Sequence, residues 1–134
     1  MDNNKVYVFR LKPGEDLRKS IEAIVKEKNI EAGWINTCVG SLIDYTIRFA
    51  NQTEGSLGSG HFEIISLTGT VSVNGCHLHI SISDSEGKTI GGHLLEGCKI
   101  YTTAEIVIGT TTAYEFTRKK DGTTEWDELQ VNKK

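Results

Sequence analysis

Three of the four histidines lie within 17 residues of one another, as His77, His79 and His93. Side chains alternate between the two faces of a β-strand, so His77 and His79 would share one face. Three neutral imidazoles with an open fourth position are a common arrangement around catalytic zinc. The pattern predicts a site for one divalent transition metal, with zinc favoured. The alternative is that the rings are hydrogen-bonded to Ser72, Thr70 or water.

Two charged residues, Arg48 and Glu105, lie in segments that are otherwise apolar or rich in threonine. Because a carboxylate there needs a partner, an ion pair between Glu105 and Arg48 is one prediction. The other is substrate handling: a metal held by three neutral histidines keeps its +2 charge, which attracts a small carboxylate and acidifies bound water. Arg48 would hold the carboxylate and Glu105 would move protons. Such a site could support decarboxylation, hydrolysis or anion binding.

Two turns must close in the right register to bring the histidines together. Asn-Gly at 74–75 is a strong signal for a two-residue hairpin turn. That turn would place Ser72 opposite His77 and Thr70 opposite His79. It would also give the two strands one apolar face, including Ile65, and one face of serine, threonine and histidine.

The second turn determines whether His93 joins the pair. Residues 84–87 (DSEG) can close as a three-residue loop with Gly87 in the left-handed conformation. His79 then lies opposite His93, with the Cβ atoms of cross-strand neighbours about 4.5–5.5 Å apart. A loop of four residues would move His93 to the opposite face of the sheet.

An amphipathic helix is predicted over 15–28, because Leu17, Ile21 and Ile24 recur at helical spacing among charged residues. We expect a flexible loop over 51–60 and a frayed lysine-rich end. The fold class predicted is α+β: one compact domain, a mostly antiparallel twisted sheet with the helix packed on its apolar face. The predicted strands are 6–11, 34–39, 44–50, 62–73, 76–83, 88–95, 100–108 and 111–118.

The chain has 134 residues, a formal net charge of −3 and a sequence pI near 5.8. This length predicts one domain over 1–134, with a tail over about 119–134. The acidic balance argues against autonomous DNA binding, which needs a basic excess. Three single cysteines without a CxxC pair indicate reduced thiols, and no apolar run suits a signal peptide or a membrane span. We therefore expect a cytoplasmic protein that binds no membrane.

Five segments of the chain resemble those of the plants and prokaryotes conserved (PPC) domain, and the resemblance extends over about 5–118. The resemblance implies a compact domain that forms homotrimers. Plant members are nuclear DNA-binding regulators that carry an AT-hook and a GRFEIL segment for contact with transcription factors. This sequence has no AT-hook, and His61 replaces the arginine of that segment. The segments are 10–17 (RLKPGEDL), 40–41 (GS), 60–70 (GHFEIISLTGT), 91–94 (GGHL) and 104–107 (AEIV).

The resemblance implies two functions. Prokaryotic members are stand-alone domains often described as DNA-binding or regulatory, which here would need a partner protein or a basic patch assembled in the trimer. The prokaryotic fold is also similar to acetolactate decarboxylase, whose zinc is held by an HxH pair and a third histidine. On that likeness the chain would be a metal-dependent lyase for a small carboxylate or oxo-acid, with Arg48 and Glu105 standing for the substrate-binding arginine and the acidic residue. The basic patch of the DNA-binding alternative would consist of Lys12, Arg18, Lys19 and Lys26.

Overall fold

Residues 4–134, which the computed structural model describes, form eight strands and one helix. The predicted α+β fold with a mostly antiparallel sheet is confirmed. The predicted strands 34–39 and 44–50 are a single strand, because the irregularity near Leu42 shifts the pairing without ending it. The elements are β1 (Lys5–Leu11), α1 (Leu17–Glu27), β2 (Gly33–Arg48), β3 (Ser56–Val71), β4 (His77–Ser83), β5 (Thr89–Leu94), β6 (Lys99–Thr110), β7 (Tyr114–Lys119) and β8 (Glu128–Lys133).

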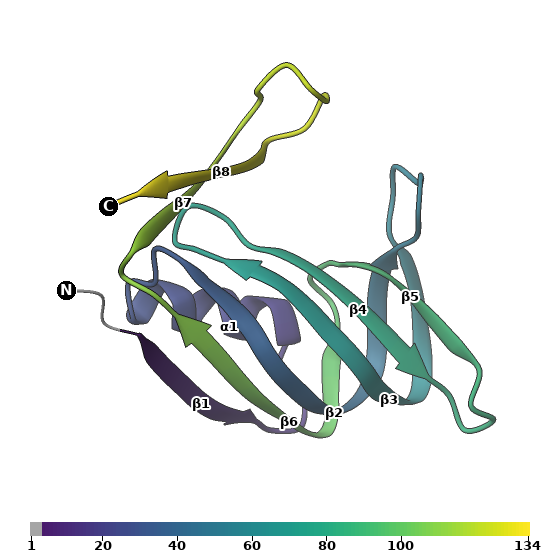
Figure 1. Cartoon of the computed structure of the whole chain (residues 1–134). Helices are drawn as coiled ribbons and strands as arrows, with labels where there is room; N and C mark the ends of the chain where they lie inside the picture. Colours follow the sequence, from purple (N-terminus) through teal and green to yellow (C-terminus); the bar gives the residue numbers. More distant parts are fainter. Residues whose placement is uncertain (1–3) are drawn as a thin grey trace.

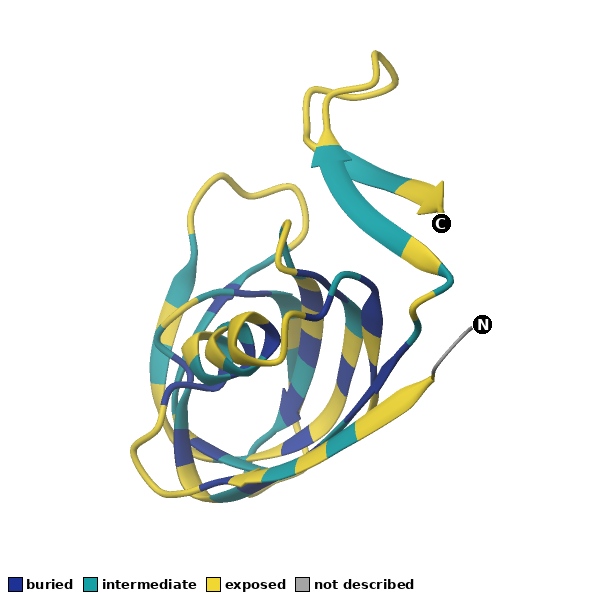
Figure 2. Ribbon diagram, turned by 90° about the vertical axis from the view of Figure 1, so that its left-hand side faces the viewer, coloured by how far each residue is buried: buried dark blue, intermediate teal, exposed yellow. Residues whose placement is uncertain are grey.

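Six strands form one strongly curved antiparallel sheet in the order β1-β6-β2-β3-β4-β5 (Figure 1). The end of β2 also pairs with β5, with Ile47 opposite Leu94 and Arg48 opposite His93. Strands β2 to β5 therefore close on themselves, and α1 lies inside the curve (Figure 2). Gly92 permits this closure, because a Cβ at that position would collide with the carbonyl oxygen of Arg48.

Helix α1 begins at a capped end and packs one stripe into the core. The Asp16 carboxylate accepts hydrogen bonds from the backbone N–H of Lys19 at 3.0 Å and of Gly97 at 2.8 Å, so it caps the helix and ties it to the loop before β6. The buried stripe continues to Val25 rather than the predicted Ile24. The side chains that α1 buries are Leu17, Ile21 and Val25.

The predicted apolar face of β3 is wrong at one position. A shift in the β3–β4 pairing between Ile64 and Ser66 inserts a bulge. Ile64 is consequently buried, whereas the side chain of Ile65 is 57% exposed. The alternation resumes after the bulge, so Leu67 and Val71 lie in the core as predicted. The predicted loop is also too long, because residues 56–60 belong to β3.

The turn between β3 and β4 is longer than the two-residue turn predicted. Thr70 pairs with His77, two residues from the predicted partner. Ser72 leaves the ladder because its hydroxyl donates to the carbonyl oxygen of Phe116 at 3.1 Å and accepts from the N–H of Asn74 at 3.1 Å. A shift of two residues preserves the face of every side chain, so His77 and His79 still point to the same side.

The turn between β4 and β5 closes as predicted. The N–H of Asp84 donates to the carbonyl oxygen of Lys88 at 3.0 Å, and Gly87 adopts a φ of 80°. His79 therefore pairs with His93 across the two strands.

The predicted strand 111–118 corresponds to β7, whereas β8 lies where a frayed tail was predicted. Strands β7 and β8 form a separate antiparallel hairpin that stands apart from the main sheet (Figure 1). Its base is attached to the body through Phe116, whose N–H donates to the carbonyl oxygen of Glu31 at 2.9 Å. The carbonyl oxygen of Phe116 accepts from the Asn74 amide at 2.9 Å. Within residues 4–134, no helix has the length and apolar character needed to cross a bilayer.

Candidate metal site

His77, His79 and His93 meet at the open ends of β4 and β5, as the register predicted. One ring nitrogen from each lies within 4.8 Å of the other two. The ring centroids are 4.9 Å apart for His77 and His79, 5.3 Å for His77 and His93, and 5.8 Å for His79 and His93. The rings are inclined to one another rather than stacked, and one nitrogen of each lies close to the other two. We refer to these three residues as the histidine cluster.

The surroundings of the histidine cluster keep the imidazoles of His77 and His93 neutral. Burial lowers the pKa of His93 to about 4, and the positive charge of Arg48 is the next cause. Burial also lowers the pKa of His77, assisted by His79 and Arg118. A neutral imidazole has a free lone pair, which is the form that binds a metal. Two of the three ligands are therefore in their metal-binding form at neutral pH.

The donor set fits a first-row divalent ion. Zinc–nitrogen bonds of about 2.0–2.1 Å in a tetrahedral site separate the nitrogens by roughly 3.3 Å. Ligand atoms within 4.8 Å of one another reach that spacing by small side-chain rotations. Three protein ligands would leave the fourth position for water or a ligand.

Arg48 lies beside the histidine cluster, whereas Glu105 does not. Arg48 pairs with His93 and lines a cavity of about 400 Å³ with His77 and His93. Glu105 is exposed on β6 and pairs with Val39, nine residues before Arg48 on β2 and thus roughly 30 Å away along the strand. Among residues 4–134 no ion pair joins the two side chains, so that prediction is wrong. Arg48 and Glu105 are far apart because of the register in which their strands pair, and the local sequence pattern does not indicate that register.

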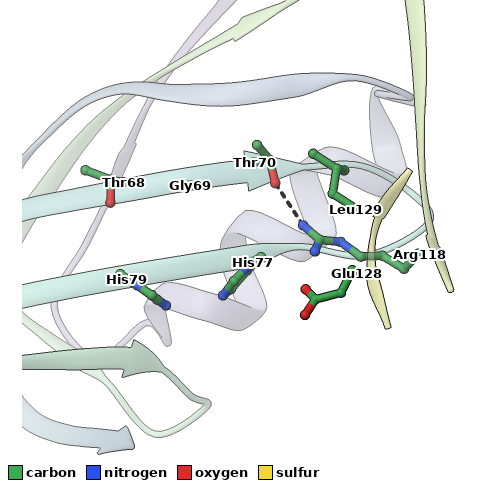
Figure 3. Close-up of a pocket in the computed structure, with 8 residues that line it drawn as sticks. All are labelled: Thr68, Gly69, Thr70, His77, His79, Arg118, Glu128 and Leu129. Atoms are coloured by element: carbon green, nitrogen blue, oxygen red, sulfur yellow. Dashed lines mark hydrogen bonds between the residues drawn. The ribbon is translucent and has the colours of Figure 1, made fainter. Parts of the chain in front are cut away.

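The β7–β8 hairpin contributes residues that the sequence analysis missed. Figure 3 shows Arg118 and Glu128 extending from the hairpin toward His77, in a cavity of about 280 Å³. Arg118 donates to the Thr70 hydroxyl at 3.0 Å. The Trp126 ring lies 5.7 Å from the Arg48 guanidinium, at the distance of a cation–π contact. The alternating residues on both sides of Asp-Gly at 121–122 were the available signal for this hairpin.

Two of the four basic residues proposed for a DNA-binding patch make side-chain contacts within the chain. Arg18 donates to the carbonyl oxygens of Leu94 at 2.7 Å and Cys76 at 3.1 Å, and its side chain is 16% exposed. Lys19 lies 3.9 Å from the Glu96 carboxylate. Arg18 thereby ties α1 to the end of β5 that carries His93. The positive charge of Arg18 also contributes to the lowered pKa of His93.

Together these features describe a small α+β protein that carries an open three-histidine centre at one end of a closed sheet. The sequence profile of the Plants and Prokaryotes Conserved (PCC) domain, also written PPC, matches residues 1–112. The chain belongs to this family. The bifunctional protein GlmU of Synechococcus sp. (strain JA-3-3Ab) is 43% identical over 129 residues, which is 96% of this chain and 21% of that protein. The chain thus spans about a fifth of the length of the curated relatives it matches.

Several solved structures are similar to the whole fold. A hypothetical protein from Salmonella enterica superposes with a TM-score of 0.96 at 37% identity, over 100% of this chain and 97% of that chain. A metal-containing protein from Archaeoglobus fulgidus gives a TM-score of 0.79 at 27% identity, over 94% and 93%. A protein from Bacteroides thetaiotaomicron, provisionally named as DNA-binding, gives 0.77 at 24% identity over 98% and 97%, a likeness of fold alone.

Proposed function

We propose that His77, His79 and His93 bind one divalent transition metal, with zinc favoured. The observation that carries this proposal is the convergence of three ring nitrogens within 4.8 Å. The lowered pKa values of His77 and His93 support it, because neutral rings bind metal without releasing protons. The metal-containing relative from Archaeoglobus fulgidus, similar over nearly the whole chain, also supports it.

The bound metal would act on a small carboxylate or oxo-acid, as in a lyase or decarboxylase. When bound, such an ion polarises an oxygen atom or acidifies a water molecule. Arg48 supports this second step of the proposal, because its guanidinium lines the same cavity as His77 and His93. A guanidinium binds a carboxylate through two parallel hydrogen bonds. Arg48 would therefore orient the ligand, and the histidine cluster would hold the ion.

Metal analysis of protein purified without a metal-affinity tag tests the site. We expect one zinc per chain in the natural protein or after exposure to micromolar zinc, and none in the His79→Ala variant. His61→Ala is the matched control, because His61 stacks on Tyr101 with a centroid distance of 4.5 Å outside the cluster. Natural protein that carries no metal and takes up none overturns the proposal, and so does equal loss in both variants.

The second candidate, DNA binding, is favoured by the family to which the chain belongs, since its prokaryotic members are often described as DNA-binding. The net charge of −3 and the internal contacts of Arg18 and Lys19 weigh against it for the isolated chain. Phosphate binding needs several free basic side chains. We expect no specific gel shift at physiological ionic strength, and a clear sequence-specific shift would make DNA binding the better proposal.

The proposed assembly is a homotrimer, as the family resemblance implies. The outer face of the sheet supports burial between copies, because the side chains of Val6, Val8 and Val39 are 59%, 74% and 56% exposed. Pairing of β1 with β6 and β6 with β2 places them on one face. The same face also carries Arg10 and Glu105, and exposed apolar side chains bordered by charged ones are typical of a protein–protein contact. Light scattering should give three times the chain mass of 14.8 kDa, and a stable monomer would contradict the trimer.

The proposed location is the cytoplasm. Cys38, Cys76 and Cys98 are unpaired thiols. Burial raises the pKa of Cys38 to about 12 and that of Cys98 to about 11, so both are neutral and unreactive. Unpaired thiols persist in reducing compartments. Fractionation of the cells that make the protein would test this location.

A further inference from the structure

We propose that the β7–β8 hairpin is part of the ligand site and makes it selective for a small dicarboxylate. This inference rests on the proposed metal site. The family profile ends at residue 112, before the hairpin begins at Tyr114. Yet hairpin residues line three cavities that contain His77, of about 280, 400 and 550 Å³. Cavities of this size suit a small organic molecule.

The hairpin is held against the site by specific contacts. Phe116 is fixed by hydrogen bonds to Glu31, Ser72 and Asn74. Beyond it, the Arg118 guanidinium donates to the Thr70 hydroxyl at 3.0 Å, and Thr70 pairs with His77. Arg118 is partly buried, so its position is restricted rather than free in solvent. The guanidinium is therefore held on the His77 side of the cluster (Figure 3).

Two guanidinium groups flank the histidine cluster from different strands. Arg48 pairs with His93 across β2 and β5, whereas Arg118 extends from β7 toward His77. Both line the cavity of about 400 Å³. The Trp126 ring contacts Arg48 at 5.7 Å and so links the hairpin to the second arginine. A ligand with two carboxylates could thus meet the metal and Arg48 with one end and Arg118 with the other.

The charge of the cavity favours a dianion. Arg48 and Arg118 contribute two positive charges, and Asp127 and Glu128 contribute two negative ones. A divalent metal on the neutral histidine cluster then leaves a net charge of about +2. A dicarboxylate neutralises that charge and places its two groups at separate cationic points. Inorganic phosphate carries its charge at a single point and uses only one of them.

The test is calorimetric titration of the full chain loaded with one zinc per chain. Succinate is compared with butyrate, which has the same carbon chain and one carboxylate, and with inorganic phosphate. We expect succinate to bind at least tenfold more tightly than either. Arg118→Gln should lower the succinate affinity at least tenfold, change the butyrate affinity less than twofold, and retain its zinc throughout. Arg10→Gln is the matched control, because Arg10 is exposed on β1 and bonds to Thr103 at 3.0 Å.

The outcomes separate this inference from the proposed function. A chain that takes up no zinc overturns both. Zinc-loaded protein that binds succinate no better than butyrate or phosphate overturns the inference alone. So does an Arg118→Gln variant with unchanged succinate affinity. Circular dichroism of Arg118→Gln checks that it folds, and Arg118→Lys, which keeps the charge but loses the paired donors, should recover part of the affinity.

Discussion

The two ends of the curved sheet both carry histidine, and they differ in what surrounds it. At one end the histidine cluster has rings inclined at 84°, 69° and 41° to one another, with nitrogens that converge. At the other end the His61 ring stacks on Tyr101 at 14°, so one flat face of the ring is covered, and His61 belongs to no group of metal-binding side chains among the described residues. The comparison shows that strand register, rather than residue type, decides which histidine can bind a metal.

The charges around the two ends differ as well. Arg48 and Arg118 flank the histidine cluster and balance Asp127 and Glu128, so a divalent metal on the cluster would make that cavity favour anions. The cavity of about 450 Å³ beside His61 is lined by the carboxylates of Glu63 and Asp84 and by no arginine or lysine. A small carboxylate would therefore be attracted to the first end and repelled from the second. Matched substitutions at the two ends should consequently have unequal effects.

The largest expected difference is in zinc affinity. His93→Gln removes one of three ligands, and we expect the affinity to fall at least about 100-fold, because loss of even an outer-shell partner costs about 10–100-fold. Tyr101→Ala exposes the His61 ring at the other end and should leave the affinity within about twofold. Competition with a chromogenic chelator measures both. If the two substitutions change the zinc affinity equally, zinc binding is not specific to the end that carries the histidine cluster.

The next prediction concerns backbone packing. In Gly92→Ala the new Cβ would meet the carbonyl oxygen of Arg48, which cannot move without opening the β2–β5 closure. We expect a loss of about 3 kcal/mol in the free energy of unfolding. In Gly60→Ala, near His61, the nearest atoms are the outer ring atoms of Phe62 at 3.1 Å, which can shift. That change should cost about 1 kcal/mol in urea unfolding, and equal costs would contradict the structural difference.

The fold and the histidine cluster were predictable because short-range signals determine them. The loop at 84–87 has one residue, Gly87, suited to its left-handed position, and this sets the β4–β5 register that joins His79 to His93. The β3–β4 turn was predicted two residues too short, because Ser72 bonds to Phe116, 44 residues away in sequence. The error left the cluster intact because a shift of two residues preserves the faces.

The rest of the site was not predictable from local pattern. The distance between Arg48 and Glu105 depends on the order of β6, β2 and β5 in the sheet, a long-range property. Trp126 and Glu128 were missed because a polar, lysine-rich end indicates a mobile tail, and Arg118 was missed because its predicted strand had no predicted partner near the cluster. Contacts from the hairpin base to Glu31 and Asn74 overcome that tendency. The composition of the tail does not indicate that it contacts Glu31 and Asn74.

A third prediction is a pH dependence specific to the histidine cluster in metal-free protein. Burial lowers the pKa of His93 to about 4 and also lowers that of His77, so between about 6.5 and 4 the unfolded chain binds more protons than the folded chain. The free energy of unfolding therefore falls as pH decreases through this window and is fully recovered above it.

His93→Gln should flatten the dependence of the free energy of unfolding on pH, whereas His61→Ala should not. Urea unfolding at several pH values measures the difference between each variant and the natural protein. The carboxylates are the same in both, so their contributions to the pH dependence cancel. An unchanged slope in His93→Gln would contradict burial of this imidazole as the cause of the pH dependence.

The smallest expected effect lies in the contact between Trp126 and Arg48, which joins the hairpin to the closed sheet. The ring is 65% exposed, so its contribution is the cation–π attraction of an exposed pair, about 0.5–1 kcal/mol. We expect Trp126→Ala to lower the melting temperature of metal-free protein by a few degrees.

A double-mutant cycle with Arg48→Gln isolates the interaction energy between the two side chains, because the second substitution should lower the free energy of unfolding less once the first has been made. His61 and Trp126 lie at opposite ends, so a parallel cycle with His61→Ala and Trp126→Ala should be additive within about 0.5 kcal/mol. If the Arg48 cycle is also additive, the hairpin is held only at its base through Phe116, and Arg48 takes its position from β2 alone.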